Sequence, residues 1–414
     1  MFPTPLQGDD IMRNDQYKAE VIDPGDSASK FAKDVCAQSY GNCPAVMVSS
    51  PDSGGFRGMV NFGYNEALYR EMSHGGLKQT LQNDGAGGKP QFHTLLGEQE
   101  AFRGLGWEIL AMILDDLARS GQFPCVVANQ IDIKGITPEN LPLFNAMMVG
   151  YGQALARAGV VNITGEIAVM KHSITAFCDT GDPAELILAW SGSCVGLSRE
   201  SMLIDGSAIR PGMPIVGLHE HGYRCNGGTF FTNLLLLLFG NNIAAMRKNP
   251  EAMNFVRKLT APSISYARMI CKAIGWNDDG TENIHAPLYG LIAGIAHITG
   301  GGVWGKFGEL LPEGVGAVLD NMPEPPSVLL EAQQMAKGTD LHLPDQQAYG
   351  TFHGGCGTMN VCVDDEAATR LLWAAEENNI DASVVGRTVE SDSNEVVIHS
   401  QFADQQLLSS LDME

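Results

Sequence analysis

The sequence predicts a fold of the mixed α+β class, divided between two domains. The chain has 414 residues, which is more than one hydrophobic core usually supports. Short apolar runs typical of strands alternate with longer runs of helical periodicity in both halves of the chain. An apolar fraction of 44% and a charged fraction of 18% fit a compact folded protein and not a disordered one. These observations favour two units in which helices pack on a sheet.

The first half of the chain supplies the elements of one sheet-bearing unit. Ser27 is a suitable N-cap for a helix over residues 27–37, in which Phe31 and Val35 recur at helical spacing. Further helices are predicted over residues 106–119 and 141–158, and strands over 45–49, from about 59 onward, and over 125–133, 160–163, 174–178 and 186–197.

The second half begins where glycine, proline and charge interrupt the apolar pattern, between Asp205 and Gly212. A strand over 214–218 leads into a polar loop at 219–228, and a leucine-rich helix follows Thr229. Further helices are predicted over 264–274 and 366–378, and a strand over 315–319. Residues 349–363 are a glycine-rich segment that runs into a strand, and the segments 288–298, 381–385 and 395–398 complete this half.

Net charge and cysteine usage limit the possible partners and the compartment. The formal charge of −22 argues against nucleic acid and anionic membranes, both of which favour basic surfaces. The most apolar run, residues 230–239, is too short to span a bilayer. Nine scattered cysteines without a C-x-x-C pair, and an N-terminus without the pattern of a signal peptide, lead us to expect a cytoplasmic protein.

A glycine-rich loop at residues 83–89 is the first candidate site. Gly85, Gly87 and Gly88 permit backbone N–H groups to approach an anion, while Asp84 and Lys89 flank them. An acid beside such a loop can hold a divalent cation, and a lysine can neutralise phosphate oxygens. The loop therefore suggests a magnesium-nucleotide site, although a solvated glycine turn explains the same residues.

Three acidic residues occur at positions where an α/β fold can place a functional carboxylate. Asp115 and Asp116 stand near the end of an apolar helix, where a buried charge needs a partner or a metal, and a solvated last turn is the alternative. Glu166 comes just after the strand predicted at 160–163, so we expect it to face a crevice at the carboxyl end of the sheet.

Two further polar segments occur in the second half. His219 and His221 alternate in the loop after a strand, and we expect them to face solvent or substrate, since zinc would need more ligands. His297 and Thr299 introduce a run of three glycines at 300–302, a pattern that suits an anion or phosphate.

Taken together, these stretches resemble the aminoimidazole ribonucleotide (AIR) synthetase family, the phosphoribosylformylglycinamidine cyclo-ligases. Residues 83–89 (NDGAGGK) are similar to the family's T-D-G-V-G-T-K, residues 111–116 to A-M-C-V-N-D, and residues 296–302 reproduce A-H-I-T-G-G-G. The other matching stretches, in the family's own order, are residues 16–18 and 22–25, 54–58, 164–170, 311–318 and 349–359.

The resemblance implies a two-domain fold, with an N-terminal ATP-binding and dimerisation domain at 16–208 and a C-terminal α/β domain at 209–400. It implies a homodimer that uses ATP and Mg²⁺ to close the ring of formylglycinamidine ribonucleotide in purine synthesis, after phosphorylation of the formyl oxygen. The residues that it implies for ATP are Gly54, Gly55, Asp84, Gly85, Gly87, Lys89, Asp116 and Glu166, of which Asp84, Asp116 and Glu166 are the implied metal ligands.

The resemblance also implies which residues serve the substrate and the chemistry. Lys18, Asn226 and His297 become the catalytic candidates, and Lys18 is also expected to neutralise phosphate charge. The substrate-binding candidates are Arg224, Asn226, Thr299, Gly300, Gly301 and Gly302. An alternative for Arg224 is a surface ion pair with Glu220.

Departures from the family's pattern keep other functions open. Arg224 stands where the family has a histidine, and Phe123, Asn129 and His353 replace two acids and an asparagine. Another ATP-using enzyme of the superfamily, such as selenophosphate synthetase or thiamine-phosphate kinase, is one alternative, although the reactive cysteine of the former is missing beside Lys18. A non-catalytic nucleotide-binding paralogue is the other.

Overall fold

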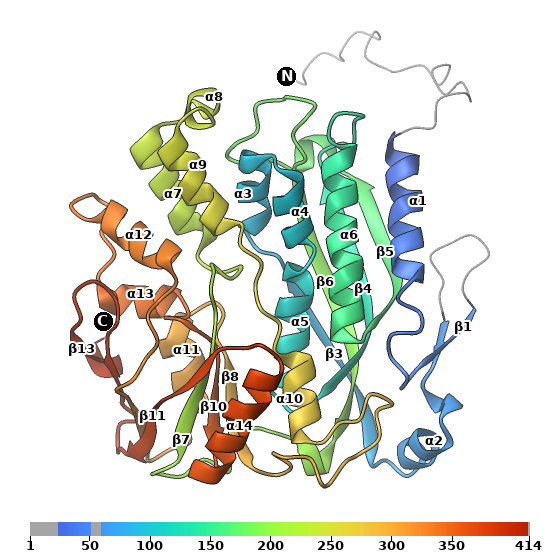
Figure 1. Cartoon of the computed structure of the whole chain (residues 1–414), viewed down its shortest axis with the longest axis vertical. Coiled ribbons are helices and arrows are strands. Elements are labelled where there is room, and N and C mark those ends of the chain that lie inside the picture. The colour runs from blue at the N-terminus through green and yellow to red at the C-terminus, as the bar shows by residue number, and fades with distance from the viewer. Residues whose placement is uncertain (1–23, 51–58, 413–414) are drawn as a thin grey trace, which may run out of the picture.

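A computed structural model describes residues 24–50 and 59–412 of the chain. The described residues form three sheets with their helices (Figure 1). One is a small antiparallel pair of strands, Met47–Ser50 and Met59–Asn61, and the two larger ones are called the first and the second sheet below. The elements up to residue 199 are α1 (Pro24–Ala37), β1 (Met47–Ser50), β2 (Met59–Asn61), α2 (Glu66–Ser73), β3 (Leu77–Gly85), α3 (Lys89–Leu96), α4 (Gln99–Leu105), α5 (Glu108–Ala118), β4 (Phe123–Ile133), α6 (Leu141–Ala158), β5 (Val161–Val169) and β6 (Leu188–Arg199).

The elements from residue 214 build the second half of the molecule. The helices are α7 (Gly228–Phe239), α8 (Ile243–Met246), α9 (Pro250–Leu259), α10 (Ala267–Ile274), α11 (Gly302–Gly308), α12 (Ser327–Ala336), α13 (Asp345–Thr351) and α14 (Asp365–Glu377). The strands are β7 (Pro214–His219), β8 (Ile292–His297), β9 (Val315–Leu319), β10 (Cys356–Cys362), β11 (Ala382–Glu390), β12 (Val396–His399) and β13 (Leu407–Ser409).

The first sheet has four strands in the order β3-β6-β4-β5, with β4 and β5 parallel and the other pairs antiparallel. Helix α5 packs on β3, β6 and β4, and α1 packs on β5 and α6. Figure 1 shows α1, α4, α5 and α6 on one face of this sheet. Helix α5 is buried along nearly its whole length because the sheet and α10 enclose it.

The second sheet has seven strands in the order β13-β12-β9-β11-β7-β10-β8. Its pairs are antiparallel except for the parallel pair of β12 and β9. Helix α14 packs on β7, β10 and β11, and α10 lies between α14 and α5. Helix α10 therefore joins the second half of the chain to the first.

Each half of the chain contributes a helix to the hydrophobic core of the other half. Phe92 and Leu95 of α3 are buried in the core of the second sheet, whereas Met269 and Ile270 of α10 are buried in the core of the first. This exchange holds the two halves against each other, because separating them would expose apolar surface from both cores.

Two strand predictions are wrong. Residues 174–178 form no strand; Phe177 packs on Phe92 and the Cys178 thiol contacts the Gln91 carbonyl, so α3, not a sheet, buries this segment. The strand predicted at 160–163 continues to Val169, so Glu166 lies within β5 and not beyond its end. Across residues 24–50 and 59–412, no helix is both long and apolar enough to cross a membrane.

Candidate functional site

Three loops from different elements converge beside the first sheet. A Cβ on Gly87 (φ +54°) would lie 2.4 Å from the Cys225 carbonyl oxygen, and a Cβ on Gly228 would lie 3.3 Å from Gly88 Cα. A Cβ on Gly300 would lie 3.4 Å from Asn226 Oδ1. The loop after β3 thus touches the loop after β7, which touches the loop after β8. Gly87 is required because a side chain there would collide with backbone.

Asp84 is the last residue but one of β3 and lies beside this convergence. Its Oδ1 accepts a hydrogen bond from the Gly85 N–H at 2.7 Å, and the residue is partly buried. Burial, and secondarily the charge of Asp116, raise the pKa of Asp84, while His297 and Lys306 lower it. A carboxylate whose pKa is raised by burial and by a second carboxylate gains from a nearby cation.

Asp116 lies close to Asp84 and is more heavily bonded. Its Oδ2 accepts a hydrogen bond from Gln82 Nε2 at 2.7 Å, and its Oδ1 lies 2.9 Å from His297 Nδ1 and 3.4 Å from Arg119 Nε. Burial works against ionisation of Asp116, but the hydrogen bond and charge of His297, with help from Arg119 and Gln82, hold its pKa below the ordinary value. Asp116 is bonded to Gln82, two residues before Asp84 on β3, and its charge acts on the Asp84 carboxylate.

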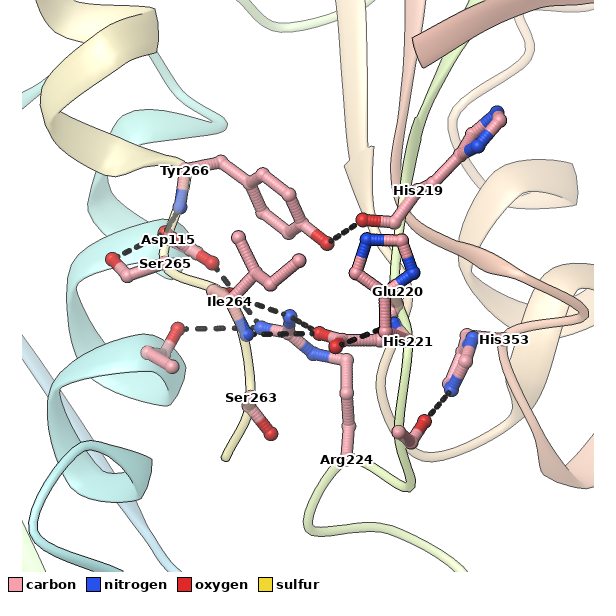
Figure 2. Close-up of polar contacts among 12 residues, drawn as sticks. Asp115, His219, Glu220, His221, Arg224, Ser263, Ile264, Ser265, Tyr266 and His353 are labelled. Carbon is pink, nitrogen blue, oxygen red and sulfur yellow. Dashed lines mark hydrogen bonds and ion pairs between the residues drawn. The ribbon is translucent and has the colours of Figure 1, made fainter. Parts of the chain in front are cut away.

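Arg224 is buried against His297, the histidine that bonds to Asp116, and this burial fits neither sequence expectation for it. Its Nη1 donates to Glu220 Oε2 at 2.6 Å and to the Ile264 carbonyl at 2.8 Å. Its Nη2 lies 3.2 Å from Asp115 Oδ2, and only 2% of the side chain is exposed (Figure 2). The pair with Glu220 exists, but it is buried and not on the surface. A guanidinium enclosed in this way does not meet a substrate phosphate in this conformation.

Asp115 is buried with protein partners, so neither a metal nor a solvated last turn accounts for it. Its Oδ1 accepts hydrogen bonds from the Tyr266 and Ala267 N–H groups, each at 2.8 Å, and from Ser265 Oγ at 3.1 Å. These donors stand at the start of α10, where backbone N–H groups lack intrahelical acceptors. Burial raises the pKa of Asp115, and Arg224 opposes that rise.

Lys89 is fully buried and does not face the loop convergence. Its ammonium donates to Glu108 Oε1 at 2.8 Å and to the Tyr223 and Ala261 carbonyls at 2.6 Å each. Because an ammonium has three N–H groups, these acceptors occupy all of them. The expectation that Lys89 neutralises phosphate is therefore corrected: it joins α3, α5 and two segments of the second half.

Glu166 lies far along the sheet from Asp84. The two residues belong to β5 and β3, the opposite edge strands of the first sheet. Glu166 is exposed and lines a cavity of about 500 Å³ between α1 and the sheet, together with Asn129 and Asn162. The described part of the chain holds no group of three acidic, histidine or cysteine side chains that could bind a metal. The expected three-carboxylate set is thus not assembled within one chain.

The remaining candidates divide between the site and its surroundings. Thr299, Gly300 and Gly301 are partly or fully exposed, and a Cβ on Gly302 would lie 2.1 Å from the Tyr349 carbonyl oxygen. His297 is buried behind them. His219 bonds to Ser383 and His221 to Asp381, on the side of β11. The candidates Lys18, Gly54 and Gly55 lie outside the described residues.

Sequence reasoning missed Glu108 and Gln82. Glu108 opens α5 and accepts hydrogen bonds from the N–H and Oγ of Ser263 besides its bond with Lys89. Gln82 holds Asp116 from β3, a strand that was not predicted. A signal for Glu108 was available, since an acid in a strongly apolar segment needs a buried partner.

Comparison with known proteins gives matches over both halves of the chain. Residues 63–184 match the N-terminal domain of AIR synthase related proteins, and residues 281–399 match their C-terminal domain. A phosphoribosylformylglycinamidine cyclo-ligase of Synechococcus sp. (strain CC9902) is 26% identical over 324 residues, which is 77% of this chain and 84% of that protein. One from Acetivibrio thermocellus is 27% identical over 343 residues, 82% of this chain and 87% of that protein.

A solved structure agrees with the fold. The hydrogenase maturation protein HypE of E. coli superposes with a TM-score of 0.51 over 93% of this chain and 98% of its own, at 14% identity. At that identity the likeness concerns the fold and not the reaction.

Proposed function

We propose that this chain, which belongs to the AIR synthase related family through both of its matched domains, is an ATP-dependent cyclo-ligase. Its substrate would be formylglycinamidine ribonucleotide, and its product aminoimidazole ribonucleotide in purine synthesis. Relatives with the cyclo-ligase name align with more than three quarters of the chain. The observation that carries the proposal is that Asp84 lies where three glycine-containing loops meet, while Asp116 is bonded to Gln82 of the same strand and to His297 at the start of one of those loops.

The carboxylate pair fits a magnesium ion that accompanies ATP. Oxygen ligands are those that Mg²⁺ prefers, and it usually uses one or two carboxylates together with substrate phosphates. Asp84 and Asp116 would hold the ion, which supplies positive charge beside the phosphates when bound. Burial, and after it the charge of Asp116, raises the pKa of Asp84, and a nearby cation would offset both effects, which supports this assignment.

The chain's own groups would act by binding and orientation. An amide oxygen leaves poorly until it is phosphorylated, and the ring then closes by attack of a nitrogen of the same molecule. Holding that nitrogen close to the reacting carbon is the main task of such a site. Asn226 and the exposed backbone at 299–301 lie beside Asp84's loop and are the candidates for gripping the substrate. Lys18, Gly54 and Gly55 remain candidates for the phosphates.

A homodimer through the N-terminal half is part of the proposal. Leu81, on the edge strand β3, is 67% exposed, and Val169, on the opposite edge strand, is 52% exposed. A second copy would cover such residues and could also bring its Glu166 toward Asp84, which a single chain does not do. All nine cysteines are free, as expected for a cytoplasmic enzyme.

The experiment is an ADP-release assay with a panel of substrates. Purified protein is given MgATP with formylglycinamidine ribonucleotide, thiamine phosphate, selenide or no second substrate. We expect ADP release to depend on the ribonucleotide. Release with another member of the panel would identify a different enzyme of the superfamily, and nucleotide binding without release under any condition would identify a non-catalytic paralogue.

A further inference from the structure

The cavity of about 500 Å³ that Glu166 lines lies at one edge of the first sheet, between α1 and β5. Figure 1 shows these two elements side by side. The volume falls within the range of about 300–1,000 Å³ that small-molecule sites occupy. Asp84 lies on β3, three strand spacings or about 14 Å across the sheet. The cavity is therefore separate from the loop convergence of the same chain.

The walls of this cavity are mostly apolar. They are formed by side chains from α1, β4, α6 and β5, namely Ala32, Ile131, Met148, Ile163 and Ile167. Apolar walls of this kind bind a flat ring by removing its faces from water. The body of a matching ligand is therefore a ring system, and its polar groups belong at the two ends of the cavity.

The buried end of the cavity offers an oriented hydrogen-bond acceptor. Asn129 Nδ2 donates to Asn162 Oδ1 at 2.9 Å and to the Tyr151 hydroxyl at 3.3 Å, and that hydroxyl donates to Asn162 Oδ1 at 2.7 Å. These bonds use both N–H groups of Asn129, so its amide is held in one orientation. Within residues 24–50 and 59–412, Asn129 Oδ1 has no donor and is not among the completely buried polar atoms. It can therefore accept a hydrogen bond from a ligand.

The mouth of the cavity carries charges of both signs. Its exposed lining residues are Lys30, Lys33, Asp34 and Glu166. Two ammonium groups and two carboxylates give no net charge, so the mouth does not select a strongly anionic ligand. Carboxylates do accept hydrogen bonds from hydroxyl groups, and an acid placed on a ribose hydroxyl is a recurrent feature of nucleoside recognition. The mouth therefore suits a neutral sugar.

We propose that this cavity binds a purine nucleoside that carries an amino group on its base, such as adenosine. The base lies between the apolar walls, its amino group donates to Asn129 Oδ1, and the ribose hydroxyls meet Asp34 and Glu166. Adenine presents an N–H donor at this ring position, whereas guanine and hypoxanthine carry a carbonyl oxygen there. The nucleoside is either free adenosine or the nucleoside half of an ATP molecule held by a second copy of the chain. The latter source rests on the proposed homodimer.

The first experiment titrates adenosine and inosine into the full-length protein and follows binding by calorimetry. We expect adenosine to bind, and inosine to bind at least about tenfold more weakly, because its carbonyl oxygen would face Asn129 Oδ1 without a donor between them. Absence of adenosine binding overturns the proposal, and so does inosine binding with the affinity of adenosine.

The second experiment places the ligand in the cavity. A substitution of Asn129 would break its bonds to Asn162 and Tyr151 and can prevent folding, so the variant is Ala37→Trp. Ala37 is the exposed last residue of α1 and lines the cavity, so a large ring there fills the space without disturbing the core. Ala244→Trp, at an exposed position of α8, is the matched control. We expect adenosine affinity to fall at least about tenfold in Ala37→Trp and to stay unchanged in Ala244→Trp. Equal adenosine affinities in the two variants overturn the proposal.

A titration of MgATP into the same two variants distinguishes the sources of the nucleoside. If Ala37→Trp loses affinity for both adenosine and MgATP, the cavity takes the nucleoside half of ATP; if it loses only adenosine, the cavity takes the free nucleoside. Either result is separable from the proposed function, because binding is measured without the second substrate. Cyclo-ligase activity in a protein whose adenosine affinity is unaffected by Ala37→Trp would leave the proposed function intact and remove only this inference.

Discussion

At the scale of single residues, a substitution of Lys89 distinguishes a structural role of its ammonium from a phosphate-binding role. Its ammonium and the Glu108 carboxylate are both fully buried and bonded to each other. Removing one partner of a buried pair leaves an uncompensated charge, which typically costs about 3–5 kcal/mol. We therefore expect Lys89→Met to lower the free energy of unfolding by about that amount in urea titrations.

Lys258→Met is the matched control for Lys89. Lys258 pairs with Glu331 at the surface, where 45% and 31% of the two side chains are exposed. Loss of such a pair costs about 0–1 kcal/mol. If Lys89→Met kept wild-type stability and lost affinity for MgATP instead, the phosphate-binding role would be restored.

His353 provides a pH-dependent prediction. Burial lowers the pKa of His353 to about 4, and its ring bonds to the Gly222 carbonyl and the Gly355 N–H as a neutral group. The unfolded chain takes up this proton near pH 6.5 and the folded chain only near 4, so stability falls as pH falls through that window. At 1.36 kcal/mol per pH unit, the loss between pH 6.5 and 5 is about 2 kcal/mol.

We expect His353→Gln to remove this part of the acid sensitivity. The measurement is the difference in unfolding free energy between pH 7 and pH 5, for the wild type, His353→Gln and the exposed control His285→Gln. An equal acid-induced loss in wild type and His353→Gln would show that His353 is protonated in the folded state.

Sequence motifs located the candidate residues better than they assigned their roles. Asp84 and Asp116 lie near the ends of β3 and α5, which pack directly on each other, so the charge of Asp116 acts on Asp84. Lys89 lies in a matching motif and Arg224 at a position where the family has a histidine, and both are buried. The pairing of Lys89 with Glu108 is revealed only by the tertiary fold, whereas the pair of Arg224 with Glu220 was expected from the sequence, but on the surface and not buried.

At the scale of elements, the contact between the loop after β3 and the loop after β7 is the feature to test. Gly87 has φ +54° and a Cβ there would meet the Cys225 carbonyl at 2.4 Å. Gly87→Ala should therefore separate the two loops, weaken MgATP binding and lower the melting temperature. Gly75→Ala is the control. Gly75 also has a positive φ, +78°, but a Cβ there would have no atom within 4 Å. The substitution therefore adds only the backbone strain, about 1 kcal/mol.

Gly87→Ala and Gly75→Ala are compared by calorimetry of MgATP binding and by thermal unfolding. Equal effects of the two substitutions on stability, with MgATP affinity unchanged in both, would show that the close approach of the loops has no part in the site.

Elements with strong apolar periodicity were predicted well, and polar ones were not. Helices α5 and α6 fall within two residues of their predicted limits because their buried faces are apolar. Strand β3 was missed because it is an edge strand rich in polar residues, with Leu77 and Leu81 as its only large apolar side chains. A strand with one solvated face shows a clear alternation of apolar and polar residues only when its covered face is apolar, and most side chains of β3 are polar on both faces.

At the scale of the whole molecule, assembly is the open prediction. The proposed homodimer would cover the exposed Leu81 and Val169 of the first sheet's edge strands. Light scattering at micromolar concentration should give about twice the mass of a 44.4 kDa chain. Leu81→Lys should shift the mass toward the monomer, whereas Trp373→Lys on α14, which also alters an exposed apolar residue, should not. A monomeric wild-type protein would contradict the dimer.

The molecule as a whole also shows what sequence reasoning about domains cannot see. The two sheets are separated by residues 200–213, close to the predicted boundary, yet α3 and α10 each pack into the core of the other half. The sequence of a helix does not reveal which half of the molecule it packs into, because an amphipathic helix has the same periodicity whichever sheet it covers.

Direct detection of the product tests the central claim. The purified protein is incubated with MgATP and formylglycinamidine ribonucleotide, and ADP and aminoimidazole ribonucleotide are quantified together by mass spectrometry. Asp84→Asn serves as the inactive control. The account predicts one ADP for each aminoimidazole ribonucleotide in the wild type, with turnover greatly reduced in Asp84→Asn. ADP release without the ring-closed product, or product formation unaffected by Asp84→Asn, would contradict it.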